Sequence, residues 1–156
     1  MHEAIELYTD GAASGNPGPG GFAAILKYRG HRREISGGFN HTTNNRMELL
    51  AVIIGLESVT NKELPVHVYS DSKYVTEAIN QNWLYNWQKT GFKNKANVDL
   101  WRRFLKVYNP VKHRFTWVKG HHTNVENNRC DELAVQAYSA GKNLPVDEGY
   151  RKLPGE

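Results

Sequence analysis

The sequence is poor in cysteine and has no long hydrophobic run near its start. Of its 156 residues only Cys130 is a cysteine. A lone thiol excludes an intramolecular disulfide and suits a reducing compartment. The first ten residues include three acidic side chains and no apolar stretch long enough for a signal peptide or a membrane span. We therefore expect a cytoplasmic protein with no membrane partner.

Several catalytic signatures are also missing. The chain has no Gly-x-Ser-x-Gly elbow and no Cys/His cluster typical of zinc sites. The Gly- and Pro-rich loop at residues 15–21 lacks the Gly-Lys-Ser/Thr ending of a phosphate-binding P-loop. We find no repeat, low-complexity segment or linker. One domain over residues 1–141 and a loose polar tail over residues 142–156 are therefore predicted.

The positive charge is concentrated in one part of the chain. The formal net charge is +4, but residues 83–119 contain nine Lys or Arg and one acidic residue, Asp99. That segment is +8, which leaves −4 for the rest. Such a basic stretch indicates either a polyanionic partner or a solvated face, and charge alone leaves both open.

Hydrophobic periodicity predicts an α/β fold with a five-stranded mixed sheet flanked by helices. The expected elements are strands at 5–9, 22–28 and 34–39, a helix at 45–57, a strand at 66–70, helical segments at 71–87 and 98–108, a strand at 113–118 and a helix around 130–138. The first three strands should form an antiparallel meander. The helix at 45–57 is apolar nearly all round, so we expect it to be well buried.

Four carboxylates occupy positions that suggest chemistry. Asp10 and Asp71 each follow a predicted strand, although Asp10-Gly11 is also a common turn pair and Asp71 could be a helix N-cap. Glu48 is the only charge on an apolar helical turn, and Asp131 lies beside an apolar helical stripe. A capping box and compensation of the helix dipole are their structural alternatives.

As a set, the four carboxylates indicate a metal site. Strands that end on the same side would bring Asp10 and Asp71 together, and sheet-packed helices could add Glu48 and Asp131. Such a cluster requires a positive charge within it, and oxygen ligands favour Mg²⁺ or Mn²⁺. A pair of these ions can cleave a phosphodiester without a nucleophilic side chain.

The chain also resembles bacterial ribonuclease H of type 1, from about residue 4 to residue 140. The motifs that carry the resemblance follow in order: Tyr8-Thr9-Asp10-Gly11, Gly15-Asn16-Pro17-Gly18-Pro19-Gly20-Gly21, Thr43-Asn44-Asn45-Arg46-Met47-Glu48, Asp71-Ser72, Val98-Asp99-Leu100-Trp101, Trp117-Val118-Lys119-Gly120-His121, Glu126-Asn127 and Arg129-Cys130-Asp131-Glu132-Leu133-Ala134. Each motif is weak alone, but their joint order and spacing are specific.

The resemblance implies a ribonuclease H-like fold and metal binding by the same four carboxylates. It implies that His121 assists catalysis from a loop. Asn16, Asn44 and Asn45 would read the RNA strand at the minor groove, where 2′-hydroxyls distinguish RNA from DNA. Thr43 would help to hold a DNA phosphate.

A basic handle for the DNA strand is implied as well. Its expected members are Trp83, Trp87, Lys89, Lys93 and Lys95. Cations would contact phosphates and flat rings would contact sugars, although both Trp residues could instead belong to the core.

The chain departs from the family pattern in two places. The loop between Gly91 and Asp99 is shorter than in familiar members. Lys73 stands near Asp71 where an uncharged Gln is common, and it could contact a phosphate.

The predicted function is hydrolysis of the RNA strand of RNA–DNA hybrids by a monomeric endonuclease. Catalysis would use two Mg²⁺ ions, with Mn²⁺ as a substitute, show no sequence specificity, and leave 3′-hydroxyl and 5′-phosphate ends. A DNA-directed relative, such as a transposase or integrase domain, is disfavoured by the asparagines, since DNA has no 2′-hydroxyl to read. A non-catalytic hybrid-binding module is disfavoured because all four carboxylates are present.

Overall fold

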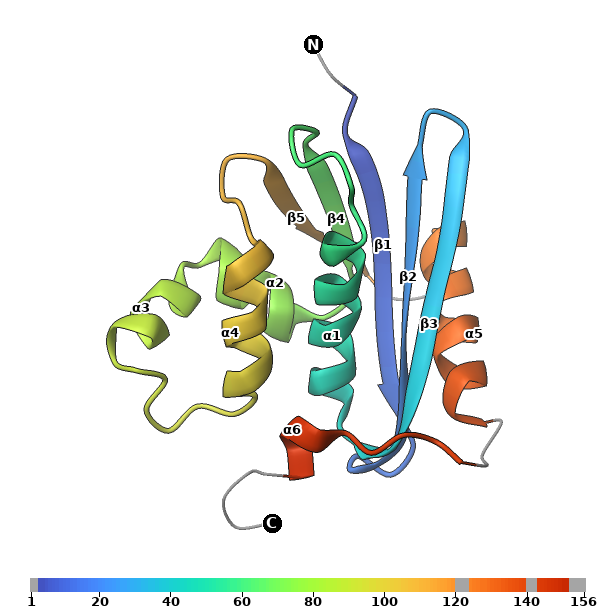
Figure 1. The fold of residues 1–156 in the computed structure, drawn as a ribbon, viewed down its shortest axis with the longest axis vertical. Coiled ribbons are helices and arrows are strands. Elements are labelled where there is room, and N and C mark those ends of the chain that lie inside the picture. Colours follow the sequence, from blue (N-terminus) through green and yellow to red (C-terminus); the bar gives the residue numbers. More distant parts are fainter. Residues whose placement is uncertain (1–2, 120–123, 140–142, 152–156) are drawn as a thin grey trace.

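The computed structural model describes residues 3–119, 124–139 and 143–151, in which one five-stranded sheet carries helices on both faces (Figure 1). The strands are β1 (Ile5–Ala13), β2 (Gly18–Tyr28), β3 (His31–Thr42), β4 (Val66–Ser70) and β5 (His113–Trp117). The helices are α1 (Asn44–Glu57), α2 (Lys73–Asn80), α3 (Trp83–Lys89), α4 (Val98–Val107), α5 (Val125–Ser139) and α6 (Glu148–Arg151).

The strand order is β3-β2-β1-β4-β5, with β1 at the centre. The first three strands pair antiparallel, whereas β4 lies parallel to both β1 and β5. This arrangement confirms the predicted mixed sheet with an antiparallel meander.

The main core lies between the sheet and α1. Helix α1 is apolar nearly all round because it packs against β1 and β2 on one side and against α4 on another. Its backbone approaches the sheet closely at Gly55, where an added Cβ would lie 2.5 Å from Leu7 Cδ1. On the opposite face, α5 covers β1 and β2 over a smaller apolar cluster that includes Cys130 and Ala134.

The two outer strands differ in length, and the longer one is tied to α5 by ion pairs. β3 has 12 residues and lies at one edge, whereas β5 has 5 residues and lies at the other. Ion pairs tie β3 to α5: Arg32 contacts Glu126 at 2.9 Å, and Arg129 contacts Glu34 at 3.0 Å. The long edge strand is therefore lined with charged side chains.

Several element boundaries differ from the predicted ones. β1 continues past Asp10 to Ala13, because the Gly-rich start of β2 keeps pairing with it. The helical segment expected at 71–87 is broken at Asn82, whose φ of 60° is left-handed. α1 begins at Asn44, and its cap is Thr43 rather than Asn45, so Glu48 does not belong to a capping box centred on Asn45.

The segment after α5 also differs from the expected loose tail. Within residues 143–151 the backbone carbonyl of Pro145 accepts a hydrogen bond from Asn40 N at 2.9 Å, and Asp147 is buried against Arg46. A buried cation requires such a carboxylate, which explains why a polar segment docks here. Residues 152–156 lie outside the described part.

Among the described residues, no helix is both long enough and apolar enough to cross a membrane.

Candidate active site

Two of the four predicted carboxylates are brought together by the parallel pairing of β1 with β4. This ladder ends where Thr9 pairs with Ser70. Asp10 follows Thr9 on β1, and Asp71 comes directly after the end of β4, so the two residues become neighbours. The predicted strand end at Asp10 was wrong for β1 as a whole, but it holds for the parallel ladder that places the two side chains.

Glu48 joins them from the first turns of α1. The backbone of α1 can lie this close to β1 only because residue 11 is a glycine. A Cβ on Gly11 would lie 2.3 Å from Glu48 N, a distance that real side chains do not tolerate. Gly11 thus sets the separation between the helix that carries Glu48 and the strand that carries Asp10.

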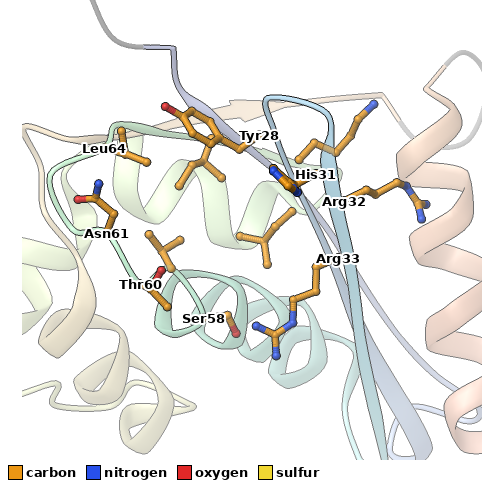
Figure 2. Close-up of a pocket in the computed structure, with 12 residues that line it drawn as sticks. Tyr28, His31, Arg32, Arg33, Ser58, Thr60, Asn61 and Leu64 are labelled. Carbon is orange, nitrogen blue, oxygen red and sulfur yellow. The ribbon is translucent and has the colours of Figure 1, made fainter.

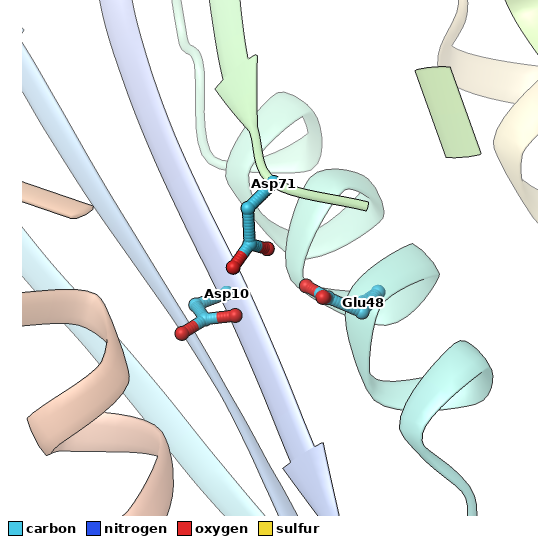
Figure 3. A group of neighbouring side chains, drawn as sticks. All are labelled: Asp10, Glu48 and Asp71. Carbon is cyan, nitrogen blue, oxygen red and sulfur yellow. The ribbon is translucent and has the colours of Figure 1, made fainter. Parts of the chain in front are cut away.

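The three carboxylates, from β1, from α1 and from the end of β4, lie close together (Figure 3). One oxygen of each of Asp10, Glu48 and Asp71 lies within 4.8 Å of the other two. Burial, followed by the charge of Asp71, raises the pKa of Asp10 to about 8. Burial and the charges of Asp10 and Asp71 also raise the pKa of Glu48 well above its usual range. Without a cation, the fold therefore disfavours full ionisation of this cluster.

The donor set fits a hard divalent ion. Two oxygens of the cluster, Glu48 Oε1 and Asp71 Oδ1, are buried and have no hydrogen-bond donor among the described residues. Asp10 Oδ1 accepts one bond, from Gly11 N at 2.8 Å. Buried carboxylate oxygens without donors are rare unless an ion or water satisfies them, and an all-oxygen set suits Mg²⁺ or Mn²⁺.

Two further residues were predicted to take part in catalysis, Asp131 and His121. Asp131 lies on α5, outside the three-residue cluster, but its charge contributes to the raised pKa of Asp10. It lines a hollow of about 610 Å³ beside α5 together with Arg32 and Glu132. His121 lies outside the described residues, so its predicted role stays a prediction.

The predicted asparagine readers lie in two exposed segments that hydrogen-bond to each other: Asn16 in the loop between β1 and β2, and Asn44 and Asn45 at the start of α1. We call the residues Thr43, Asn44 and Asn45 the asparagine turn. Asn16 Oδ1 accepts the backbone N–H of Asn44 at 3.0 Å, and Asn44 Oδ1 accepts that of Ala13 at 2.5 Å. Thr43 caps α1 by accepting Arg46 N at 3.2 Å, and Asn45 is exposed on the first turn. The amide oxygens of Asn16 and Asn44 are thus engaged within the protein, and their NH₂ groups remain the donors toward solvent.

Three of the five predicted handle residues, Trp83, Trp87 and Lys95, line a second hollow of about 270 Å³. Lys73 lines it as well. Trp83 is 43% exposed, whereas Trp87 is half-buried with its ring at 5.7 Å from that of Trp101. The alternative that both Trp residues belong to the core therefore holds in part for Trp87 and does not hold for Trp83. Lys89 and Lys93, which follow Trp87 in the sequence, are exposed.

Lys73 is held beside the acidic cluster by a residue to which we assigned no role. Its Nζ lies 4.7 Å from the centre of the Trp117 ring. The Trp117 indole donates to the backbone carbonyl of Asp71 at 3.0 Å. Trp117 therefore links the cation to the segment that carries a predicted metal ligand.

Arg46 is a further residue that sequence reasoning missed. Its side chain is 1% exposed, and it pairs with Asp99 and Asp147. A charged residue inside an apolar helix was a signal that a partner must exist, but the pattern could not say which of 16 acidic residues supplies it.

A groove at the opposite end of the sheet is separate from this site. It measures about 230 Å³, and the side chains that line it, shown in Figure 2, include the apolar residues Ile5, Leu26 and Leu64. Arg33 and His31 lie on its rim. None of the described residues that line it carries a carboxylate, so it does not share the chemistry of the acidic cluster.

The fold and the acidic cluster together define a class: nucleases that hold carboxylates at the centre of a mixed sheet. The sequence profile described as RNase H matches residues 2–139. The chain therefore belongs to the RNase H family, whose members are endoribonucleases.

Curated relatives are similar in sequence over nearly the whole chain. A ribonuclease H of Desulforamulus reducens is 51% identical over 148 residues, covering 92% of each chain. A ribonuclease H of Aeromonas salmonicida is 48% identical and covers 97% of this chain and 99% of its own.

Solved structures show the same fold. LC9-RNase H1, described as a type 1 RNase H with the type 2 active-site motif, has a TM-score of 0.78 at 27% identity, covering 90% of this chain and 74% of its own. LC11-RNase H1, solved in complex with an RNA/DNA hybrid, has a TM-score of 0.65 at 26% identity, covering 87% of this chain and 97% of its own.

Proposed function

We propose that the protein hydrolyses the RNA strand of RNA–DNA hybrids with divalent metal ions, as an endonuclease without sequence specificity. The observation that carries the proposal is the cluster of Asp10, Glu48 and Asp71, with two buried oxygens that have no donor within the described ranges, beside the exposed asparagine turn. Family membership and the hybrid complex of LC11-RNase H1 support the choice of substrate.

The residues that would hold Mg²⁺, or Mn²⁺ in its place, are Asp10, Glu48, Asp71 and Asp131. Two bound ions would supply Lewis-acid activation of water and would stabilise charge on the scissile phosphate. The carboxylates neutralise and position those ions. We infer products with 3′-hydroxyl and 5′-phosphate ends, and His121 as the group that moves a proton at the water or at the leaving oxygen.

Substrate choice would come from the exposed turn. Because the amide oxygens of Asn16 and Asn44 already accept backbone N–H groups, their NH₂ groups are presented as donors. Such donors suit a 2′-hydroxyl or the base acceptors of a minor groove. Thr43 and Asn45 flank this pair. A B-form DNA duplex offers no 2′-hydroxyl, so discrimination follows from the fixed direction of these donors.

Phosphate contacts would come from the cations on the other side of the cluster. Two ammonium groups lie over aromatic rings: that of Lys73 over Trp117, and that of Lys95 at 4.9 Å from the centre of the Trp87 ring. Together with Trp83, Lys89 and Lys93 they form the proposed handle for the DNA strand. We further infer that one chain, acting as a monomer, is sufficient for cleavage.

One experiment tests the proposal. End-labelled RNA–DNA hybrid, RNA duplex and DNA duplex of one sequence are incubated with the protein, with and without Mg²⁺, and resolved on a gel. We expect metal-dependent cleavage of the hybrid RNA alone, with products that a ligase requiring a 5′-phosphate can join. Glu63→Gln, an exposed carboxylate variant, should cleave like the wild type, whereas Asp10→Asn should not. Equal cleavage of the DNA duplex would favour the transposase-like alternative.

A further inference from the structure

The C-terminal segment holds a buried charge network at the start of α1. The Arg46 guanidinium donates to both oxygens of Asp99 at 2.8 Å, and to Asp147 Oδ2 at 2.8 Å and Oδ1 at 3.0 Å. A fifth, longer contact of 3.4 Å reaches Asn97 Oδ1. All donors of a cation that is 1% exposed are thus used.

Asp147 is the buried member of the two carboxylates. Its side chain is 8% exposed, against 41% for Asp99. Besides Arg46, Asp147 accepts the Thr42 hydroxyl at 2.7 Å and the Tyr150 backbone N–H at 3.3 Å. Asp147 therefore has donors from β3, from α1 and from its own segment.

The segment is fitted closely to this position. Figure 1 shows it crossing one end of the sheet and reaching the start of α1 at α6. Gly149 leaves no room for a side chain, because an added Cβ would lie 1.8 Å from Asp99 Oδ2 and 2.6 Å from Arg46 Nη2. The contact is thus a built docking of residues 143–151 and not a surface association.

The two residues that Asp147 binds outside its own segment flank the exposed asparagine turn. Thr42 is the last residue of β3, and Arg46 lies in the first turn of α1. Between them lie Thr43, Asn44 and Asn45, two of which are exposed. One buried carboxylate thus fixes both ends of a three-residue turn.

We propose that residues 143–151 act as a clasp, and that Asp147 is a positioning residue for hybrid binding. Through Thr42 and Arg46 it holds the asparagine turn in the conformation that presents its donors to the minor groove. This inference rests on the proposed function, because it concerns how that site selects its substrate. Asp147 touches neither substrate nor metal in this scheme and acts only through the turn.

The chain offers a matched control at the other end of α1. There Arg103 on α4 donates to both oxygens of Glu57 on α1, at 2.8 Å and 2.7 Å. Glu57→Gln removes an Arg–carboxylate pair between α1 and α4, away from the turn. Asp147→Asn keeps the shape of the side chain, and Asp99 still neutralises Arg46. Thr42→Val removes only the hydroxyl contact.

The test measures the affinity of the full chain for an RNA–DNA hybrid and for DNA duplex of the same sequence. Fluorescence anisotropy without divalent metal gives Kd, and steady-state kinetics with Mg²⁺ gives KM and kcat, all well below each variant's Tm. We expect Asp147→Asn to weaken hybrid binding and raise KM about tenfold, the size of one lost charged contact. The affinity for DNA duplex and kcat should change less than about twofold.

Glu57→Gln should leave both affinities unchanged, and Thr42→Val should give a smaller loss that is again confined to the hybrid. Equal losses on hybrid and DNA duplex, or an unchanged KM for Asp147→Asn, would overturn the proposal. Should Asp147→Asn fail to fold, Thr42→Val decides by the same criterion. A wild-type chain without preference for the hybrid would refute the proposed function itself, whatever the variants show.

Discussion

Replacing Asp10 by Asn should stabilise the metal-free protein while abolishing cleavage. The Asp10 carboxylate lies within 4.8 Å of oxygens of Glu48 and Asp71, and burial with the charge of Asp71 raises its pKa to about 8. Its ionised form is therefore disfavoured in the fold relative to the unfolded chain. Asn has nearly the same shape and carries no charge, so it removes the repulsion without leaving a cavity.

The sign and size of the effect follow from linkage. A carboxyl whose folded pKa lies above its unfolded value of 3.8 gives full stability at low pH, and this stability is lost as the pH rises toward 8. At pH 7 the full shift would cost about 4 kcal/mol. Because the protons are shared among coupled carboxylates, we take about 2 kcal/mol, or roughly 4–8 °C in Tm for a chain of this size.

Urea denaturation in EDTA at pH 7 and at pH 4 measures the effect. The free energy of unfolding of Asp10→Asn should exceed that of the wild type at pH 7. The two values should match at pH 4, where the wild-type carboxyl is protonated. Added Mg²⁺ should raise the stability of the wild type more than that of the variant, since a bound ion stabilises the native state by mass action. A variant less stable than the wild type at pH 7 in EDTA would refute the argument that the cluster is electrostatically strained.

Three other perturbations test separate parts of the protein. Neutralising Lys89, Lys93 and Lys95 together should weaken hybrid binding and reduce the slope of log K against log salt by roughly 0.9 per lost phosphate contact; an unchanged slope would show that the loop does not touch the backbone. His121→Ala should lower kcat by about 10²-fold with little change in KM, as expected for a general acid–base group, whereas His122→Ala should be nearly silent; equal, small effects of the two substitutions, or a larger loss at His122, would contradict this assignment. Burial and a nearby lysine lower the pKa of His113 to about 4, and its Nδ1 accepts a backbone N–H at 3.1 Å. Its neutral form is therefore favoured in the fold, and stability present above pH 6.5 should fall by about 1–2 kcal/mol toward pH 4, after a discount for partial exposure. His113→Asn can accept the same bond and should flatten this loss in urea titrations; an unaltered pH profile would count against the assignment.

The sheet could be predicted because its signals are local. The pattern of apolar residues located β4 at 66–70 as observed, and the predominantly apolar helix at 45–57 was predicted to within one residue of α1. The extension of β1 to Ala13 could not be predicted, since it depends on pairing with glycines of β2 that have no side-chain pattern. The break at Asn82 was missed because a single left-handed residue leaves the helical periodicity on either side intact.

The candidate site was predictable to the extent that it follows from topology. Asp10, Glu48 and Asp71 were named from strand ends and one helix; the parallel ladder brings Asp10 and Asp71 together, and the close packing of α1 at Gly11 adds Glu48. The Arg46–Asp147 pair could not be predicted, because the two residues lie about a hundred positions apart in the sequence and no periodicity connects them. Trp117 was missed for a similar reason, since its role depends on a ring face that Lys73 covers.

The charges along β3 have a consequence for how the chain behaves at high concentration. A 12-residue outer strand presents a row of backbone groups that a second sheet could extend by hydrogen bonding, which is a common route to aggregation. Arg32 and Glu34 on this strand form ion pairs with Glu126 and Arg129, and a foreign strand would have to pack against those charges. The opposite outer strand, β5, is too short to offer a long template. The ion pairs between β3 and α5 therefore act against fibrous association, a role separate from any contribution they make to holding the helix in place.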